Sequence, residues 1–131
     1  MKTEVSMQAT KFDSGKPPVG LIPQQALLAE ARVMAFGAEK YGRDNWRKGM
    51  DWSRLTDAAL RHLLAFIDGE TLDPETGLPH LAHVRCCTAF LLTYAAQNLG
   101  RDDRYINKTG DGNAIKNVPE RDGHSGVRVQ G

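Results

Sequence analysis

An acidic segment spanning residues 68–80 holds the side chains best suited to metal chemistry. Its four carboxylates and closing imidazole belong to Asp68, Glu70, Asp73, Glu75 and His80. Hard divalent ions such as Mg2+ and Mn2+ need several oxygen ligands, and Mn2+ also accepts imidazole. The segment therefore predicts a metal site, with a solvated acidic turn built on Pro74 and Gly77 as the alternative. It is not an EF-hand, because the alternating Asp positions and the central glycine of that loop are missing.

Three histidines strengthen the metal interpretation. His62 lies on the apolar stripe of one predicted helix, and His80 and His83 lie on the apolar stripe of the next. Several imidazoles close together are unfavourable to protonate, and a shared metal ion or carboxylate relieves that cost. At least one of the three is therefore predicted to have a functional role. Glu30, a carboxylate on the otherwise apolar stripe of the first predicted helix, is a further candidate metal ligand.

The two cysteines of the chain, Cys86 and Cys87, are adjacent and cannot form an ordinary disulfide that closes a loop. Zinc could use Cys87 together with His80 and His83, but structural zinc sites usually draw their ligands from two paired motifs, and no second motif is present. Buried helical cysteine is common as a small hydrophobe. We therefore expect both thiols to pack in the core, in a reducing cytosolic setting.

Two basic stretches could bind phosphate. Residues 11–17 form a glycine-containing loop that includes Lys16, but they lack the Gly-Lys-Ser/Thr of a P-loop. In residues 40–49 the candidates for contacts with a nucleotide are Lys40, Tyr41, Asn45 and Trp46. Aromatic rings can stack on a base, asparagine can read its edge, and cations can hold phosphate. The alternative for this second stretch is an exposed interhelical loop with one tryptophan in the core.

The elements that must position these residues are helical. Apolar residues recur at helical spacing over residues 23–41, 53–68 and 79–99, and no segment shows sustained period-two alternation. Pro23 suits a first helical turn, and Ser53 is predicted to be the N-cap of the second helix. The prediction is an all-α fold, a bundle of about three core helices per chain. Their wide apolar faces predict that oligomerisation completes the bundle.

The flanking segments differ from this helical domain, which is placed at residues 23–100. Residues 1–22 are punctuated by glycine and proline and are predicted to be an irregular loop segment. Residues 101–131 are polar and contain several glycines, so they cannot bury much apolar surface. We expect a tail that is disordered or packed on a neighbour.

The overall composition limits the partners. A formal net charge of +1 over 131 residues argues against a protein that binds a nucleic-acid polymer through bulk charge. A polyanionic ligand would need locally focused charge or a bound cation. The apolar runs are too short to span a bilayer, and no apolar leader follows Met1, so neither a membrane partner nor secretion is expected.

Three blocks together carry a family resemblance that covers roughly residues 11–98. They are residues 11–17, residues 37–49, and residues 61–83 with Arg61-His62-Leu63, Glu70-x-x-Asp73 and His80-Leu81-Ala82-His83. They resemble the phage and bacterial dATP/dGTP diphosphohydrolases, a MazZ-like branch related to the MazG-type all-α nucleoside triphosphate pyrophosphohydrolases. The resemblance implies a MazG-like fold with helices packed across a homodimer or homotetramer. It also implies Mg2+ or Mn2+ as the cofactor.

The implied reaction splits a deoxynucleoside triphosphate into its monophosphate and pyrophosphate. The preferred substrate would be dGTP, with GTP or dATP as further candidates. In a phage that replaces adenine by 2-aminoadenine, such an enzyme would provide dGMP in the host cytoplasm. One departure from the MazG pattern concerns the metal ligands. No Glu-x-x-Glu lies on the preceding helix, Glu70-x-x-Asp73 falls in the loop, and His80-x-x-His83 takes the corresponding spacing on the last helix.

The resemblance and the residue types together give a set of candidate roles. The candidate metal ligands are Glu30, Glu70, Asp73, Glu75, His80 and His83. The candidate catalytic residues, which would position or deprotonate the attacking water, are His62, Glu70, Asp73 and His83. The candidate substrate-binding residues are Lys16, Lys40 and Arg61 for phosphate, and Tyr41, Asn45 and Trp46 for the nucleoside.

Several alternatives remain open at this point. Arg61 could instead form a helix pair with Asp57, four residues earlier. The chain could also be a nucleotide-binding regulator without turnover, which would use the basic and aromatic loop but would not need the acidic cluster. A purely structural helical dimer with a metal-stabilised loop is the third possibility.

Overall fold

The computed structural model describes residues 7–106 and contains three α-helices and two short 3-10 helices. In chain order these are η1 (Val19–Leu21), α1 (Gln24–Tyr41), η2 (Asn45–Lys48), α2 (Trp52–Ile67) and α3 (His80–Gln97). The described residues contain two isolated β-bridges and no strand, so the all-α prediction is confirmed. None of the described helices is long and apolar enough to cross a membrane.

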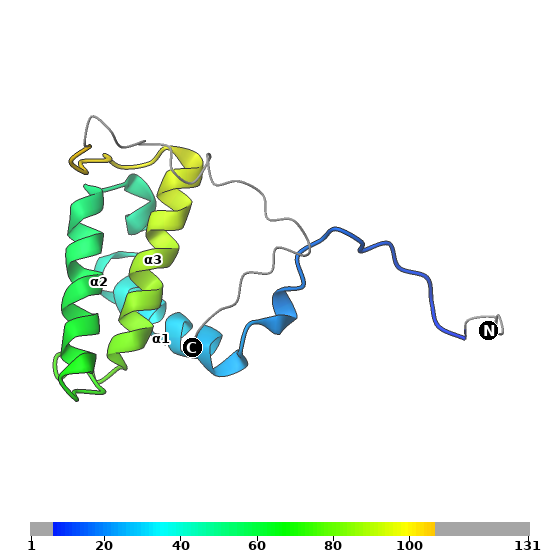
Figure 1. The fold of residues 1–131 in the computed structure, drawn as a ribbon, viewed down its shortest axis with the longest axis horizontal. Coiled ribbons are helices and arrows are strands. Elements are labelled where there is room, and N and C mark those ends of the chain that lie inside the picture. Colours follow the sequence, from blue (N-terminus) through cyan, green and yellow to red (C-terminus); the bar gives the residue numbers. More distant parts are fainter. Residues whose placement is uncertain (1–6, 107–131) are drawn as a thin grey trace, which may run out of the picture.

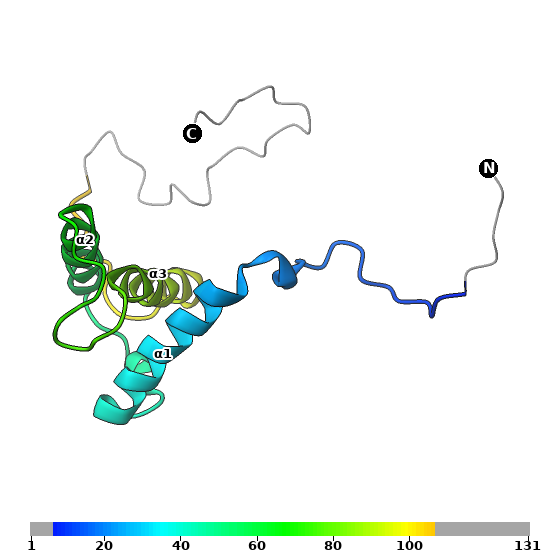
Figure 2. The same ribbon diagram turned by 90° about the horizontal axis from the view of Figure 1, so that it is seen from below.

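Helices α2 and α3 lie side by side and run antiparallel, and α1 crosses α3 on its other side (Figures 1 and 2). Helix α3 therefore forms the centre of the fold and packs against both neighbours. One core cluster joins Val33 of α1 to Ala82 and Cys86 of α3. A second cluster joins Leu55 of α2 to Cys87 and Tyr94 of α3. Small residues on α3 allow α1 and α2 to approach it closely from two sides.

The cysteines belong to this core, as the sequence predicted. Both thiols are free and buried, and burial raises the pKa of Cys86 to about 12. Burial also raises the pKa of Cys87. The Cys86 Sγ lies 3.7 Å from the Sδ of Met34. Because a thiolate is the form that attacks or binds metal, these thiols act as packing groups.

Tyr94 fixes the loop between α1 and α2 to the core. Its side chain is 0% exposed, and its hydroxyl donates a 2.6 Å hydrogen bond to the carbonyl oxygen of Trp46 in η2. The Trp46 ring also stacks on Phe90 of α3, with ring centroids 4.5 Å apart and an interplanar angle of 13°. Two directional contacts therefore hold η2 against α3.

The start of α2 is fastened to the end of α3 by a set of contacts that we call the closing seam, residues 49–53 with residues 99–103. The Trp52 indole nitrogen donates to the Leu99 carbonyl (2.9 Å). The guanidinium of Arg101 forms two hydrogen bonds to the Asp51 carboxylate. Asp103 accepts the backbone N–H of Ser53 (2.9 Å) and the Ser53 hydroxyl.

The prediction that Ser53 caps α2 is wrong. The helix begins at Trp52 after Asp51, whose side chain makes no capping bond, and Ser53 lies inside the first turn. Asp103 supplies the acceptor from a distant part of the chain, and the hydrogen bonds from Ser53 hold the pKa of its carboxyl below the usual range. Sequence spacing could not reveal this cap because the two residues are 50 positions apart.

Two glycines let the backbones of the seam approach each other. Gly49 and Gly100 both have positive φ angles, of 87° and 69°. A Cβ on Gly49 would lie 2.5 Å from the Gly100 nitrogen, and a Cβ on Gly100 would collide with the Met50 carbonyl oxygen. Larger residues would therefore be opposed by both backbone strain and collision.

The chain before α1 extends away from the bundle (Figures 1 and 2). Large apolar side chains on it are exposed, among them Phe12 (86%) and Leu21 (80%). The predicted C-terminal tail is described only as far as residue 106. Its first residues form part of the closing seam of their own chain, and residues 107–131 lie outside the described residues.

Candidate active site

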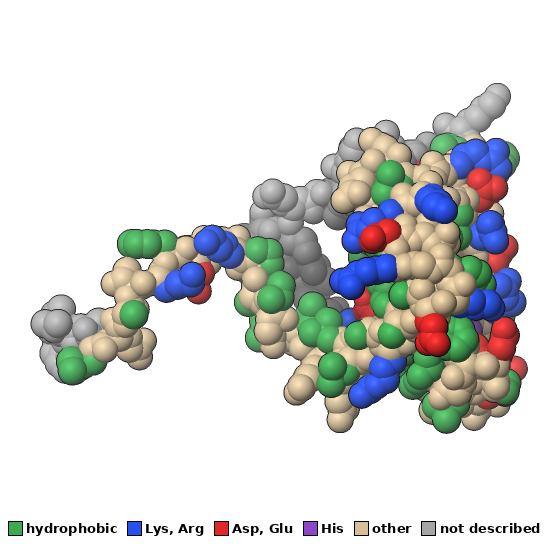
Figure 3. Space-filling model, turned by 180° about the vertical axis from the view of Figure 1, so that it is seen from behind, with side chains coloured by type: hydrophobic (Ala, Val, Ile, Leu, Met, Phe, Trp, Pro, Cys, Tyr) green, Lys and Arg blue, Asp and Glu red, His purple; other side chains and the backbone are tan. Residues whose placement is uncertain are grey.

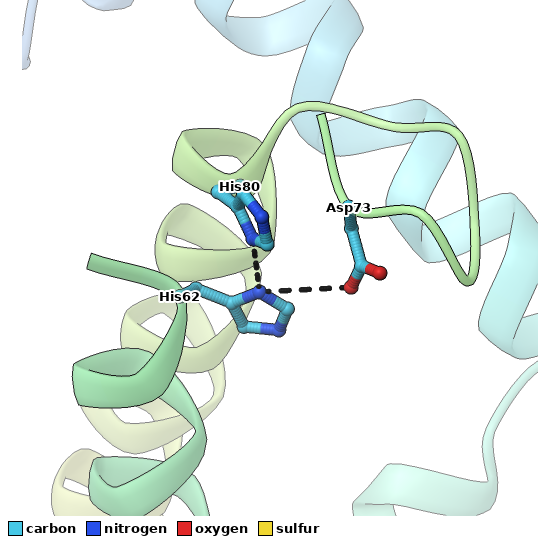
Figure 4. Close-up of side chains that lie close together, drawn as sticks. All are labelled: His62, Asp73 and His80. Carbon is cyan, nitrogen blue, oxygen red and sulfur yellow. Dashed lines mark hydrogen bonds and ion pairs between the residues drawn. The ribbon is translucent and has the colours of Figure 1, made fainter. Parts of the chain in front are cut away.

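Three predicted site residues converge where α2 ends and α3 begins (Figure 4). His62 comes from α2, His80 is the first residue of α3, and Asp73 lies in the loop between them. The Nδ1 atoms of His62 and His80 are 2.9 Å apart, and His62 Nδ1 lies 3.7 Å from Asp73 Oδ2. Within the described residues, these three form a group whose ligand atoms all lie within 4.8 Å of one another.

The loop between α2 and α3 is shaped by its own backbone bonds. Asp73 N–H donates to the Leu78 carbonyl (2.8 Å), and Gly77 N–H donates to the Asp73 carbonyl (2.7 Å). Gly77 has a φ of 73°, which suits glycine. An antiparallel bridge joins Leu72 to Pro79 at the base of the turn. Closing the loop in this way holds the Asp73 carboxylate near the histidines, and its side chain is only 14% exposed.

A chain of hydrogen bonds determines which ring nitrogen carries hydrogen in His80 and in His62. His80 Nε2 lies 2.7 Å from Glu70 Oε1, and an ionised carboxylate can only accept, so this nitrogen carries hydrogen. In the neutral ring, His80 Nδ1 is then left with its lone pair and accepts the Nδ1–H of His62. Glu70 thus orients His80, which is 5% exposed, rather than joining the group of three ligand atoms.

His83 extends the cluster by one turn of α3. Its ring stacks on His62, with centroids 4.3 Å apart and an interplanar angle of 7°. Its Nε2 lies 2.8 Å from the Thr76 hydroxyl and 3.8 Å from Asp73 Oδ2. Burial lowers the pKa of His83, with the Asp73 carboxylate opposing that shift. Burial and the neighbouring His83 lower the pKa of His62. Both rings therefore favour the neutral form, which can bind metal or accept a proton.

The donor set fits a divalent cation that accepts nitrogen. Two imidazoles and one carboxylate suit an ion such as Mn2+, whereas Mg2+ prefers an octahedron of oxygens. The closest contact within the set is the 2.9 Å approach of the His62 and His80 Nδ1 atoms. A cation placed there would replace the proton that the two rings share. The Glu70–His80 pair has the carboxylate–histidine arrangement that commonly supports a metal-binding imidazole.

We expect acid to destabilise the fold through these histidines. Because their folded pKa values lie below the ordinary 6.5, the unfolded chain binds more protons than the folded chain once the pH falls below about 6.5. Stability is therefore full above about pH 6.5 and decreases across the acidic range below it. Urea denaturation in EDTA across this range should show a weaker pH dependence for His83→Gln than for the unsubstituted chain. Identical pH slopes would contradict this role of His83.

A cleft of about 1460 Å³ adjoins the cluster. Its walls come from the second half of α1, the η2 loop and one side of α2, and His83 and Thr76 line the end near the histidines. The cleft exceeds the roughly 300–1,000 Å³ of typical small-molecule sites, so it has room for a nucleotide. Seen from behind, the molecule carries Lys and Arg side chains interleaved with Asp and Glu (Figure 3).

Several predicted substrate residues line this cleft, namely Tyr41, Asn45, Trp46 and Arg61. Trp46 contributes to the cleft wall while its ring packs on Phe90, and the Arg47 guanidinium lies 4.5 Å from the ring centroid. The alternative role for Arg61, a helix pair with Asp57, is not observed: no ion pair joins these two described residues. The Arg61 guanidinium is thus left available within the cleft.

Other predicted residues neither line the cleft nor belong to the group of three ligand atoms. Glu30 forms an ion pair with Arg85 of α3, at 3.0 Å between Oε1 and Nε. Glu75 is exposed, and its backbone N–H donates to Asp73 Oδ1 (2.7 Å). Lys40 is exposed, and its Nζ lies 5.2 Å from the ring centroid of Tyr41. Lys16 lies in the extended segment before α1.

Comparison with known proteins identifies the chain. The family model described as dATP/dGTP diphosphohydrolase, N-terminal, matches residues 6–104. The chain belongs to the dATP/dGTP diphosphohydrolase family. A member from Salmonella phage PMBT28, named dATP/dGTP diphosphohydrolase, is 41% identical over 98 residues, which cover 75% of this chain. Those residues make up 33% of that phage protein, so the chain spans about a third of its length. No solved structure matches the chain significantly.

In this member of the dATP/dGTP diphosphohydrolase family, several side chains line the cleft to which the sequence assigned no role. Among them are Arg54 and Thr76. Arg54 had a signal in the sequence, since it lies seven residues before Arg61 and shares its side of α2. Thr76 had none, because its contact with His83 depends on how the loop folds.

Proposed function

We propose that this chain is a metal-dependent diphosphohydrolase that splits dGTP or dATP into the monophosphate and pyrophosphate. The observation that carries the proposal is the convergence of His62, Asp73 and His80 beside a cation-lined cleft, in a chain of this family. His83 connects the two parts, because it lines the cleft and stacks on His62. The phage relative carries the same activity in its name.

In this proposal His62, Asp73 and His80 hold the cation, and Glu70 orients His80. A bound divalent cation would neutralise phosphate charge and make a water molecule more acidic. Mn2+ fits these donors better than Mg2+ does. Glu75 and Glu30 are weaker candidates as ligands, because Glu75 is exposed and Glu30 is paired with Arg85.

His83 is the proposed general base. Its lowered pKa leaves the ring neutral at neutral pH, and its place on the cleft wall lets it meet a water molecule beside the substrate. Thr76 and Asp73 hold the ring in place through contacts at Nε2. Arg61 would bind phosphate, and Tyr41, Asn45 and Trp46, which line the same cleft, would contact the nucleoside.

The proposed assembly is a homodimer or homotetramer. Large apolar side chains are exposed on two helices: Leu27, Leu28 and Phe36 of α1, and Leu60, Leu64 and Ile67 of α2. A second copy covering these faces would remove apolar surface from water. Lys16 and Lys40 do not line the cleft of their own chain, so each would reach phosphate from the partner. In a phage that uses 2-aminoadenine, the dGMP formed would supply that pathway in the host cytoplasm.

The test is incubation of the full chain with dGTP, dATP or GTP and either Mn2+ or Mg2+, followed by chromatography of the products. The proposal expects monophosphate plus pyrophosphate, faster with Mn2+ and abolished by EDTA. Unchanged nucleotide that nevertheless binds would indicate a regulator without turnover. Release of diphosphate and orthophosphate would indicate a different hydrolase.

A further inference from the structure

One side of α2 presents two arginines to the cleft. Arg54 and Arg61 are seven residues apart, nearly two helical turns, so they share this side and are separated by about 10 Å along the helix axis. Both are exposed, and neither forms an ion pair with another described residue. Two flexible cationic side chains at this spacing can converge on one extended anion.

The charges around these arginines favour an anionic ligand. The cleft is lined by five cations and three acids: Arg43, Arg47, Lys48, Arg54, Arg61, Glu39, Asp44 and Asp57. Arg47 is already bound to Asp44, with 2.9 Å between Nε and Oδ1. That leaves four cations against two acids, although the whole chain has a net charge of only +1. The positive excess is therefore local to the cleft.

The two arginines differ in their distance from the histidine cluster. Arg61 precedes His62 directly in the sequence, and its charge contributes to the lowered pKa of that histidine, after burial and the other charged neighbours. Arg54 lies nearly two turns away, toward the start of α2. A phosphate chain whose reacting end lies beside the cluster would thus pass Arg61 first and reach Arg54 only if it is long enough.

We propose that Arg54 and Arg61 form a polyphosphate-binding row in which Arg61 binds the phosphates nearest the cluster and Arg54 binds the terminal phosphate. Arg54 is then the residue that distinguishes a triphosphate from shorter chains. The proposal deepens the proposed function, since it assigns the substrate's phosphate chain to one wall of the same cleft. It concerns binding alone and requires neither turnover nor a bound metal ion.

The experiment is calorimetric titration of the full chain in EDTA with inorganic tripolyphosphate, pyrophosphate or orthophosphate. The unsubstituted chain should bind tripolyphosphate more tightly than pyrophosphate. Arg54→Gln should weaken tripolyphosphate binding by about 10-fold, the effect of losing one charge-assisted contact, and should leave pyrophosphate unchanged. Arg61→Gln should weaken both ligands. Arg32→Gln, an exposed arginine of α1 that does not line the cleft, should change neither.

The outcomes separate this proposal from the proposed function. The proposed polyphosphate-binding row would be overturned if Arg54→Gln weakened the binding of tripolyphosphate and pyrophosphate equally, or weakened the binding of neither. Thermal unfolding of each variant verifies that the fold is intact, and Arg54→Lys should restore part of the tripolyphosphate affinity. A chain that binds tripolyphosphate in this manner but never hydrolyses dGTP would support the row and refute the proposed function.

Discussion

Replacing Asp73 with asparagine is expected to lower kcat/KM for dGTP hydrolysis in Mn2+ by about 10²–10³-fold. That factor corresponds to about 3–4 kcal/mol of transition-state stabilisation, the scale expected when a charged metal ligand is removed. Asparagine keeps an oxygen that can accept the Glu75 N–H, so the turn should survive while the charge facing His62 and His83 is lost. Steady-state kinetics and Mn2+ titration of the same variant provide the two measurements.

Asp68→Asn is the matched control for Asp73→Asn. Asp68 lies in the same loop, is exposed, and is not one of the three grouped ligands. It should retain both turnover and Mn2+ affinity, which excludes a general effect of removing one negative charge. Full turnover of Asp73→Ala with Mn2+ present would refute the assignment of Asp73 to the metal site.

Replacing Tyr94 with alanine is expected to lower the free energy of unfolding by about 3–5 kcal/mol, the usual cost of removing a large buried ring. The side chain is fully buried between α2 and α3 and also binds the Trp46 carbonyl. Much of the stability of a small domain would be lost. Urea denaturation followed by circular dichroism measures the change.

A second variant separates the packing of the Tyr94 ring from the hydrogen bond of its hydroxyl, and a third serves as the control. Tyr94→Phe keeps the ring and removes the hydrogen bond to Trp46, so it should cost about 1–2 kcal/mol and loosen η2 more than the helices. Tyr105→Ala is the control, because Tyr105 is 92% exposed and should leave stability nearly unchanged. A loss for Tyr94→Ala no larger than that for Tyr105→Ala would contradict the packing described.

The helices and the histidine cluster could be predicted because they depend on local periodicity. The apolar stripes predicted the bounds of α1 and α3 closely. His62 and His80 lay on such stripes, which had to face the core. Once α2 and α3 pair antiparallel, a histidine late in one helix and another early in the next are brought together. Asp73 joined them as expected from its place in the connecting loop.

Contacts between distant parts of the chain escaped prediction. The cap on Ser53 comes from Asp103, and Glu30 pairs with Arg85 instead of joining the cluster. Glu70 was proposed as a ligand, but its hydrogen bond to His80 Nε2 suggests an orienting role. Each outcome depends on the angle at which helices cross and on how a loop closes, and neither is encoded in spacing along the sequence.

The closing seam has a consequence for how the protein folds while it is being synthesised. The acceptor that caps the start of α2 is encoded 50 residues after it, and the glycine that lets the backbone beside η2 approach is Gly100. A nascent chain still short of Gly100 can form helical turns and the contacts of Trp46 with Phe90 and Tyr94, but it lacks the contacts that fasten the start of α2 to the end of α3. On the ribosome the fold should therefore close late, when residues 99–103 emerge, rather than grow one helix at a time.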